Sequence, residues 1–373
     1  MLPEFEGSAP RLALAAIALF SLIAETACSA VTLDSPRDYQ VFQRGTVTAG
    51  KIVVRAHQSH GCDAAEARIA DRWQPLHVDA NCRIDDTLAA PVGGWYRLEV
   101  RFRTSGRITA QTSVAHVGVG EVFVISGQSN ATNFGEVRQT TRTGMVSTFD
   151  GARWRIAADP QPGVQDGSTQ GSFIPAFGDA LYGRLKVPVA VACVGYGGTS
   201  VRQWLPKGDR FGSPPSSPDF FTAVGANQWE SDGRLFEGMV QRIRQLGPGG
   251  FRALLWHQGE GDSHQSEGHE ISGAEYRRMM ERLIRAVRDA TWDFPWMVAQ
   301  VSYHSPDDSS SEDIRAAQAS LWKDGIALEG PDTDTLTGGN RQDGGTGVHM
   351  SAKGLQAHGA MWAEKVGQWI SQR

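Results

Sequence analysis

From Gly120 onward, apolar strand-like runs alternate with helix-like segments to the end of the chain, and this alternation constrains the fold most strongly. The strand-like runs are Glu121–Ser126, Val187–Val194, Ala253–Trp256 and Trp296–Ser302. Helical spacing of apolar residues is found in Pro175–Leu185, Arg234–Leu246, Ala274–Ala290, Glu312–Lys323 and Ala352–Ile370. This order predicts an α/β fold in which a parallel sheet is covered by helices on both faces. Ligands of such sheets bind at the carboxyl ends of the strands.

The preceding residues, 31–118, have a different pattern, in which short alternating runs are separated by turn residues. The clearest runs are Lys51–Ala56, Trp95–Thr104 and Ile108–Val117, and only Ala64–Trp73 has helical periodicity. The pattern predicts a small antiparallel β-sandwich. The predicted organisation is a signal peptide at 1–30, a β-sandwich-like accessory domain at 31–118 and an α/β domain at 119–373.

The N-terminal segment is typical of an export signal. Arg11 precedes the apolar stretch Leu12–Ala24, which is too short to span a bilayer comfortably. Small residues follow, and cleavage after Ala30 is expected. Cys28 raises the alternative of a lipoprotein, but Glu25 stands where a lipobox has an aliphatic residue. We therefore predict a secreted or periplasmic protein with no membrane span in the mature chain.

Export affects the interpretation of the cysteines. Cys62 and Cys82 lie in one β-rich stretch, and an oxidising compartment favours a disulfide between them. Cys193 lies in an apolar run and is expected to be a buried free thiol. No cysteine or histidine spacing indicates a metal site, and we interpret His257, His264 and His269 as parts of a solvated loop.

Charge argues against one class of partner. The formal net charge is -5, and acidic and basic residues are interspersed along the chain. The sequence has no basic stripe that could neutralise phosphates, so nucleic acid is excluded as an expected partner.

Four polar motifs follow strands or precede the last helix, and their residue types suit acyl-transfer chemistry. Ser129 follows an apolar strand and a glycine, a position from which a serine nucleophile can face the ligand edge of the sheet. A Gly-rich turn, Gly195–Ser200, could direct backbone amides into a site. Trp256–Asp262 contributes several polar side chains at the end of a strand. His349 precedes the last helix and offers an imidazole, the usual general base. Each motif alone also fits an ordinary turn or helix cap.

Together the four motifs resemble those of the SGNH hydrolases, specifically the sialate O-acetylesterase-like carbohydrate esterases. The matching segments are Gly120–Asn130, Gly197–Ser200, Trp256–Asp262, Val348–Gly354 and the helix segment Arg315–Gln318. The resemblance extends from about Gly120 to the C-terminus, and it makes 119–373 an SGNH-type esterase domain with a three-layer α/β/α fold. It implies a two-step acyl transfer without a metal or other cofactor.

The resemblance also implies roles for individual residues. Ser129 is expected to attack the ester carbonyl, with His349 as base and then acid. The oxyanion is expected to be held by the backbone amides of Ser129 and Gly198 and by the side-chain amide of Gln258.

One position departs from the family pattern. Many relatives have an aspartate three residues before the catalytic histidine, where this sequence has Thr346. Asp343 is the first candidate to orient His349 instead, and Glu260 and Asp262 are alternatives. A backbone carbonyl could also complete a Ser-His dyad.

The expected substrate is an acetylated carbohydrate, either sialic acid or a polysaccharide, from which acetyl esters are hydrolysed. Two other functions stay open, transfer of acetyl to a glycan and carbohydrate binding without catalysis. Trp204 could stack on a sugar ring or pack in the core. The sequence does not determine the oligomeric state.

Overall fold

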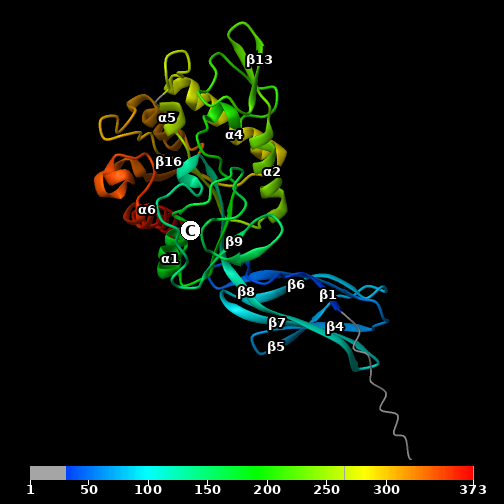
Figure 1. Ribbon diagram of the computed structural model, residues 1–373. Coiled ribbons are helices and arrows are strands. Elements are labelled where there is room, and N and C mark those ends of the chain that lie inside the picture. The colour runs from blue at the N-terminus through cyan, green and yellow to red at the C-terminus, as the bar shows by residue number, and fades with distance from the viewer. Residues whose placement is uncertain (1–30, 264, 373) are drawn as a thin grey trace, which may run out of the picture.

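The computed structural model describes residues 31–263 and 265–372. These form a larger α/β region and an N-terminal β region that projects from it (Figure 1). The predicted signal segment and its cleavage site lie outside the described residues. In the described ranges, no helix is both long enough and apolar enough to cross a membrane.

The α/β region is built on a sheet with the strand order β10-β9-β11-β8-β15-β16-β17. All neighbouring strands in this order are parallel except β10, which pairs antiparallel with β9 at one edge. The bounds are β8 Arg107–Gly127, β9 Val146–Phe149, β10 Trp154–Ile156, β11 Val189–Cys193, β15 Ala253–His257, β16 Trp296–Gln300 and β17 Leu328–Asp332. The four predicted strands are therefore confirmed as neighbours at the centre of this sheet.

Helices cover both faces of the sheet. Their bounds are α1 Ile174–Leu185, α2 Arg234–Leu246, α3 Glu260–Ser263, α4 Gly273–Ala290, α5 Glu312–Lys323 and α6 Ala352–Ser371. Alternate residues of β8 point to opposite faces, as the period of a strand requires. Val122 and Val124 join the core beneath α2, α4 and α5, whereas Phe123 and Ile125 join the core beneath α1 and α6. The predicted three-layer α/β/α fold is confirmed.

The N-terminal β region is a sandwich, as predicted. Its first sheet has the order β1-β3-β6, and its second is formed by β5, β4, β7 and the first half of β8, with β2 beside β8. The bounds are β1 Val31–Ser35, β2 Gln40–Gln43, β3 Ala49–Gln58, β4 Ala64–Ile69, β5 Arg72–Leu76, β6 Arg83–Pro91 and β7 Gly93–Thr104. Apolar side chains from both sheets form one core, with Ile52, Val54, Val100 and Phe102 fully buried.

The helical periodicity noted at Ala64–Trp73 does not correspond to a helix in the structure. The segment forms the hairpin β4–β5, with Ala70 at a φ of 50° in the turn. Ala65, Ala67 and Ile69 are buried in alternation, so the period is that of a strand. The alanine-rich composition favoured a helix locally, but pairing with β7 outweighs that preference.

β8 joins the two regions. Up to Val119 it pairs with β7, and from Glu121 it pairs with β11 and β15, so the predicted boundary between residues 118 and 119 lies inside one strand. The Glu121 carboxylate is fully buried and binds Arg44 at 2.6 Å and Arg252 at 2.8 Å. Since a buried carboxylate needs such partners, these contacts tie the sandwich to the α/β sheet.

The cysteines and a small additional sheet complete the fold. The predicted disulfide between Cys62 and Cys82 is confirmed. Cys193 is a buried free thiol on β11, and burial raises its pKa to about 12, which leaves it unreactive. A small antiparallel sheet that the sequence did not predict follows β11, with bounds β12 Arg210–Phe211, β13 Phe221–Gly225 and β14 Gln228–Ser231.

Candidate active site

Ser129 lies in a sharp turn at the carboxyl end of β8. Gly127 ends the strand with a φ of +133°, and a Cβ there would lie 2.0 Å from the carbonyl oxygen of His257 on β15. Only glycine therefore allows the two strand ends to approach this closely. Ser129 then begins a short 3-10 helix, Ser129–Ala131, and is 5% exposed. The turn presents the serine at the ligand edge of the sheet, as predicted.

The Gly-rich turn after β11 lies directly on the serine turn. The N–H of Tyr196 donates to the carbonyl of Gly127 at 2.9 Å. Two residues later, Gly198 is exposed, has a φ of +72° and has no atom within 4 Å of its would-be Cβ. Among the described residues, neither the N–H of Ser129 nor that of Gly198 has a protein acceptor. These two amides are free to bind a developing oxyanion.

Gln258 has a different environment from the predicted one. Its Nε2 donates to Asp262 Oδ2 at 2.7 Å and to the carbonyl of Thr199 at 3.1 Å, and lies 3.4 Å from Gln128 Oε1. The side chain is fully buried, and both Nε2 hydrogens face protein acceptors. The geometry therefore does not support the expected role of the Gln258 amide as an oxyanion donor. The contacts of this amide connect the segment Trp256–Asp262 to the Gly-rich turn and to the serine turn.

Asp262 does not contact His349; it anchors the Gly-rich turn instead. Its carboxylate accepts from the Ser200 hydroxyl and, at 2.8 Å, from the N–H of Val201. Arg202 lies 3.7 Å from the same carboxylate, and both side chains are completely buried. The alternative of Asp262 as the acid behind the histidine is therefore wrong, because its oxygens are engaged by the turn that carries Gly198.

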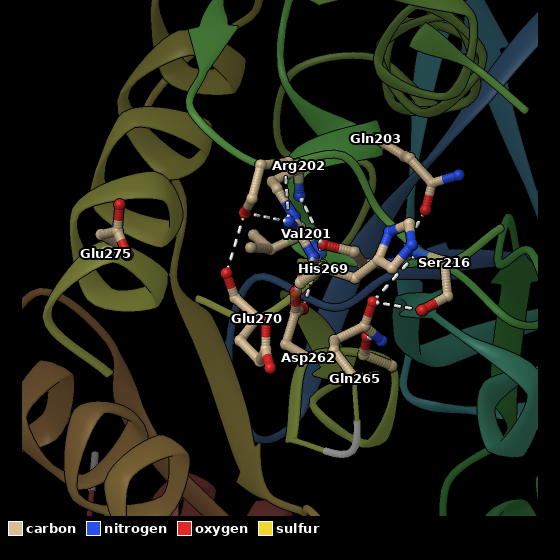
Figure 2. A network of polar contacts seen from close by, with 12 residues as sticks. Val201, Arg202, Gln203, Ser216, Asp262, Gln265, His269, Glu270 and Glu275 are labelled. Carbon is tan, nitrogen blue, oxygen red and sulfur yellow. Dashed lines mark hydrogen bonds and ion pairs between the residues drawn. The ribbon is translucent and has the colours of Figure 1, made fainter. Parts of the chain in front are cut away.

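Arg202 extends this network to two surface loops, as Figure 2 shows. Its guanidinium donates to the carbonyls of Ser213 at 2.7 Å and His269 at 2.9 Å. Nearby, Gln265 Oε1 accepts from the N–H of Ser216 at 3.0 Å. The loops after β11 and β15 are thus fixed to each other and to the Gly-rich turn. Burial lowers the pKa of Arg202, and the charge of Asp262 opposes that effect.

Glu260 is buried beside the serine turn. Its Oε1 accepts from Asn130 Nδ2 at 2.9 Å, and its Oε2 has no partner among the described residues. Burial raises the pKa of Glu260 to about 7, although the Asn130 hydrogen bond lowers it. The carboxyl group does not contact His349, so the alternative of Glu260 as the orienting acid is also wrong. It fixes the asparagine that follows the nucleophile.

The loop that carries His349 is anchored to the serine turn. Asn130 Nδ2 donates to the carbonyl of Val348 at 3.2 Å, which links the residue after Ser129 to the residue before His349. The ring of Phe134 stacks on the imidazole with a centroid distance of 5.1 Å. The structure therefore places the turn that contains Ser129 next to the loop that contains His349.

Sequence reasoning missed Arg341, which holds this loop from the inside. The side chain is 2% exposed, and its guanidinium donates to the carbonyls of Leu336, Thr333 and Val348, the last at 2.7 Å. It also lies 3.8 Å from the centre of the Tyr303 ring. No motif marks this arginine, because its partners are backbone carbonyls that only the folded chain brings together.

The expectation that Asp343 orients His349 is wrong. Asp343 is exposed, has a φ of 54° and makes no hydrogen bond to the imidazole. The polar partner of His349 Nδ1 is instead the side-chain amide of Gln342, the residue before Asp343, with its Nε2 at 3.0 Å. The Thr346 hydroxyl donates to the carbonyl of Asp343 and so stabilises the turn. Sequence reasoning missed Gln342 because it searched for an acid.

The imidazole of His349 is neutral over the physiological pH range. Burial, with a smaller contribution from the nearby positive charge of Arg341, lowers the pKa of His349 to about 4. Asp343 acts in the opposite direction, through its charge, and is outweighed. A neutral imidazole can accept a proton from a serine hydroxyl, as a general base must.

Two other residues singled out in the sequence are part of the core. Trp204 is fully buried, packs edge-on against Trp256 and donates its ring N–H to the Thr199 hydroxyl, so it cannot stack on a sugar. His257, expected in a solvated loop, is fully buried at the end of β15, with Nε2 3.0 Å from the Thr333 hydroxyl. Within the described ranges, no three His, Cys, Asp or Glu side chains are grouped as metal ligands.

Comparison with known proteins identifies similar chains. A family model described as carbohydrate esterase, sialic acid-specific acetylesterase, matches residues 119–368. The fold is similar to that of a carbohydrate acetylesterase from Xanthomonas citri, with 17% identity, a TM-score of 0.56, and coverage of 92% of this chain and 76% of that one. Weaker likenesses are a protein from Arabidopsis thaliana (18% identity, TM-score 0.46, 67% and 98% covered) and NanS (14% identity, TM-score 0.44, 68% and 98% covered). No curated protein matches the chain.

Proposed function

Because the chain belongs to the carbohydrate esterase family of sialic acid-specific acetylesterases, we propose that it hydrolyses O-acetyl esters of carbohydrates with Ser129 as nucleophile and His349 as base. The observation that carries the proposal is the pair of hydrogen bonds from Asn130. They join the residue after Ser129 to buried Glu260 and to the carbonyl before His349. Asn130 thus links the turn that carries the proposed nucleophile to the loop that carries the proposed base, which supports acyl transfer by this pair.

The reaction proceeds in two steps. Ser129 Oγ attacks the acetyl carbonyl while its proton passes to His349 Nε2, and the carbonyl oxygen becomes an oxyanion. The N–H groups of Ser129 and Gly198 donate to that oxygen. The sugar oxygen leaves with the proton from His349, which gives the free hydroxyl and acetyl-Ser129. Water then attacks the acetyl group, again with His349 as base, and acetate and free Ser129 result.

Acetate release from a panel of acetylated carbohydrates tests the proposal. The panel contains O-acetylated sialic acid, acetylated xylan and an acetylated bacterial polysaccharide, each with its deacetylated form as blank. We expect release of acetate from at least one of them and from p-nitrophenyl acetate. A protein that retains these glycans on a column but releases no acetate would contradict the proposal and would indicate a binding protein.

We also propose that the chain acts outside the cytoplasm. The Cys62–Cys82 disulfide supports this location, because such bonds persist in oxidising compartments. The predicted signal at residues 1–30 agrees with it. Fractionation of cells that produce the full chain, with sequencing of the mature N-terminus, tests both parts.

The pH dependence of kcat/KM follows from the state of His349. Since the base must be neutral and its pKa is lowered to about 4 by burial and by Arg341, we expect activity on p-nitrophenyl acetate to stay constant as the pH falls from 7 to 5. Protonation of the imidazole should reduce it only near pH 4. Burial raises the pKa of Glu260 to about 7, so this group could also change the activity near pH 7. The variant Glu260→Gln separates the two groups, because a change in activity near pH 7 that persists in this variant cannot come from Glu260. An acid limb near pH 6.5, the ordinary pKa of histidine, would contradict the site described.

A further inference from the structure

Gln342 occupies the position from which serine hydrolases orient their catalytic histidine. Its Nε2 lies 3.0 Å from His349 Nδ1, and its own N–H donates to the His349 carbonyl at 3.0 Å. The Gln342 carbonyl in turn accepts from the N–H groups of Gly345 and Gly347, each at 3.0 Å. The residue is therefore held at both backbone groups, and its side chain is directed to the imidazole.

Among the described residues, no carboxylate is hydrogen-bonded to His349 Nδ1. The charged groups that act on His349 are Arg341, whose hydrogen bonds go to backbone carbonyls, and Asp343, whose side chain points to solvent. From the serine turn, the ring of Phe134 covers one face of the imidazole and carries no charge. The hydrogen-bonding partner of Nδ1 in the described structure is the amide of Gln342 alone.

An amide and a carboxylate act differently on a histidine. A carboxylate only accepts, so it holds the ring proton on Nδ1 and leaves Nε2 free as a base. A glutamine amide has a donor end and an acceptor end. In the structure the donor end faces Nδ1, which places the ring proton on Nε2, where it blocks proton transfer from Ser129. Rotation of the Gln342 amide by half a turn presents its Oε1 to His349 Nδ1. The ring proton then lies on Nδ1, and His349 Nε2 is available as a base.

We propose that the orientation of the Gln342 amide selects the tautomer of His349, and that Gln342 is thus the positioning residue where related triads have a carboxylate. The inference rests on the proposed function, since it concerns the base of that reaction. It also predicts a gain of activity. A carboxylate at position 342 would hold the productive tautomer permanently, would stabilise the imidazolium and would remove the need for rotation.

The test compares Gln342→Glu with wild type, with Asp343→Asn as the neighbouring control. In ¹⁵N spectra of the histidine side chains at pH 7, we expect the proton of His349 on Nε2 in wild type and in Asp343→Asn, and on Nδ1 in Gln342→Glu. With p-nitrophenyl acetate, kcat/KM of Gln342→Glu should rise by roughly tenfold or more, and its acid limb should move to higher pH, because a lost triad carboxylate costs about 10⁴-fold.

Gln342→Met provides a second variant of similar size that cannot bind Nδ1, and we expect it to show both tautomers. The inference is overturned if the His349 tautomer is the same in wild type, Gln342→Glu and Gln342→Met, or if Asp343→Asn changes it as much as Gln342→Glu does. The spectra need no turnover. A shift of tautomer in a protein that hydrolyses no ester would therefore count against the proposed function and not against the role of Gln342, whereas an active esterase with unchanged tautomers would count against Gln342 alone.

Discussion

Ser129→Ala is expected to reduce the rate of acetate release from p-nitrophenyl acetate by about 10⁴-fold or more while the protein stays folded. The expected loss is this large because the proposed mechanism has no acetyl intermediate without the Ser129 hydroxyl, and the residual rate then depends on binding and the oxyanion amides alone. Alanine keeps the backbone N–H of residue 129 and fits a turn whose geometry is set by Gly127. The measurement is single-turnover acetate release, with circular dichroism as the check on folding.

Ser126→Ala is the matched control for this variant. Ser126 lies three residues earlier on β8, is fully buried, and has a hydroxyl without a partner among the described residues. Its removal deletes the same kind of atom from the strand that leads into the serine turn, and not from the turn itself. We expect near wild-type kcat/KM for Ser126→Ala. Equal losses in both variants would mean that Ser129 acts through stability rather than chemistry.

Asp262→Ala is expected to have the second largest effect, on both stability and rate. The substitution leaves Arg202 buried without its carboxylate, and breaking a buried ion pair from one side costs about 3–5 kcal/mol in the free energy of unfolding. It also removes the acceptor of the Ser200 hydroxyl, of the Val201 N–H and of Gln258 Nε2. The turn that carries Gly198 should lose its fixed position, and kcat should fall together with stability.

Two measurements separate these effects. Urea unfolding, monitored by tryptophan fluorescence, measures stability, and steady-state kinetics at low temperature measure the rate. Asp343→Asn is the control, because this aspartate is exposed and lies in the histidine loop without a contact to the imidazole, and asparagine tolerates its φ of 54°. It should leave the unfolding free energy within about 0.5 kcal/mol of wild type. If Asp262→Ala were as stable as Asp343→Asn, the network around Arg202 would not hold the site as described.

The layered fold and the location of the site could be predicted from the sequence because both depend on local patterns. Apolar runs such as Val187–Val194 have the length and composition of buried parallel strands, and the parallel order places their ends at one edge. Ser129 and His349 could be identified because the motifs that contain them follow one another in the same order as in the SGNH hydrolases. Ala64–Trp73 shows the limit of such patterns, since pairing with β7 decided its conformation.

The partners of the site residues could not be predicted, because they are set by contacts between distant segments. Asp262 and Glu260 are close in sequence, yet one binds the Gly-rich turn and the other binds Asn130. Arg341 is identified only by the three carbonyls around its guanidinium. Gln342 was passed over because an amide in a loop is ordinary until its neighbour is known to be the imidazole.

Trapping the covalent intermediate tests the central claim most directly. The protein is mixed with p-nitrophenyl acetate, quenched in acid within the first turnover and digested, and the peptides are analysed by mass spectrometry. The mechanism predicts one added acetyl group on Ser129, lost on incubation of the unquenched enzyme and absent from Ser129→Ala. Acetylation of a different residue during turnover, or full turnover by Ser129→Ala, would contradict it.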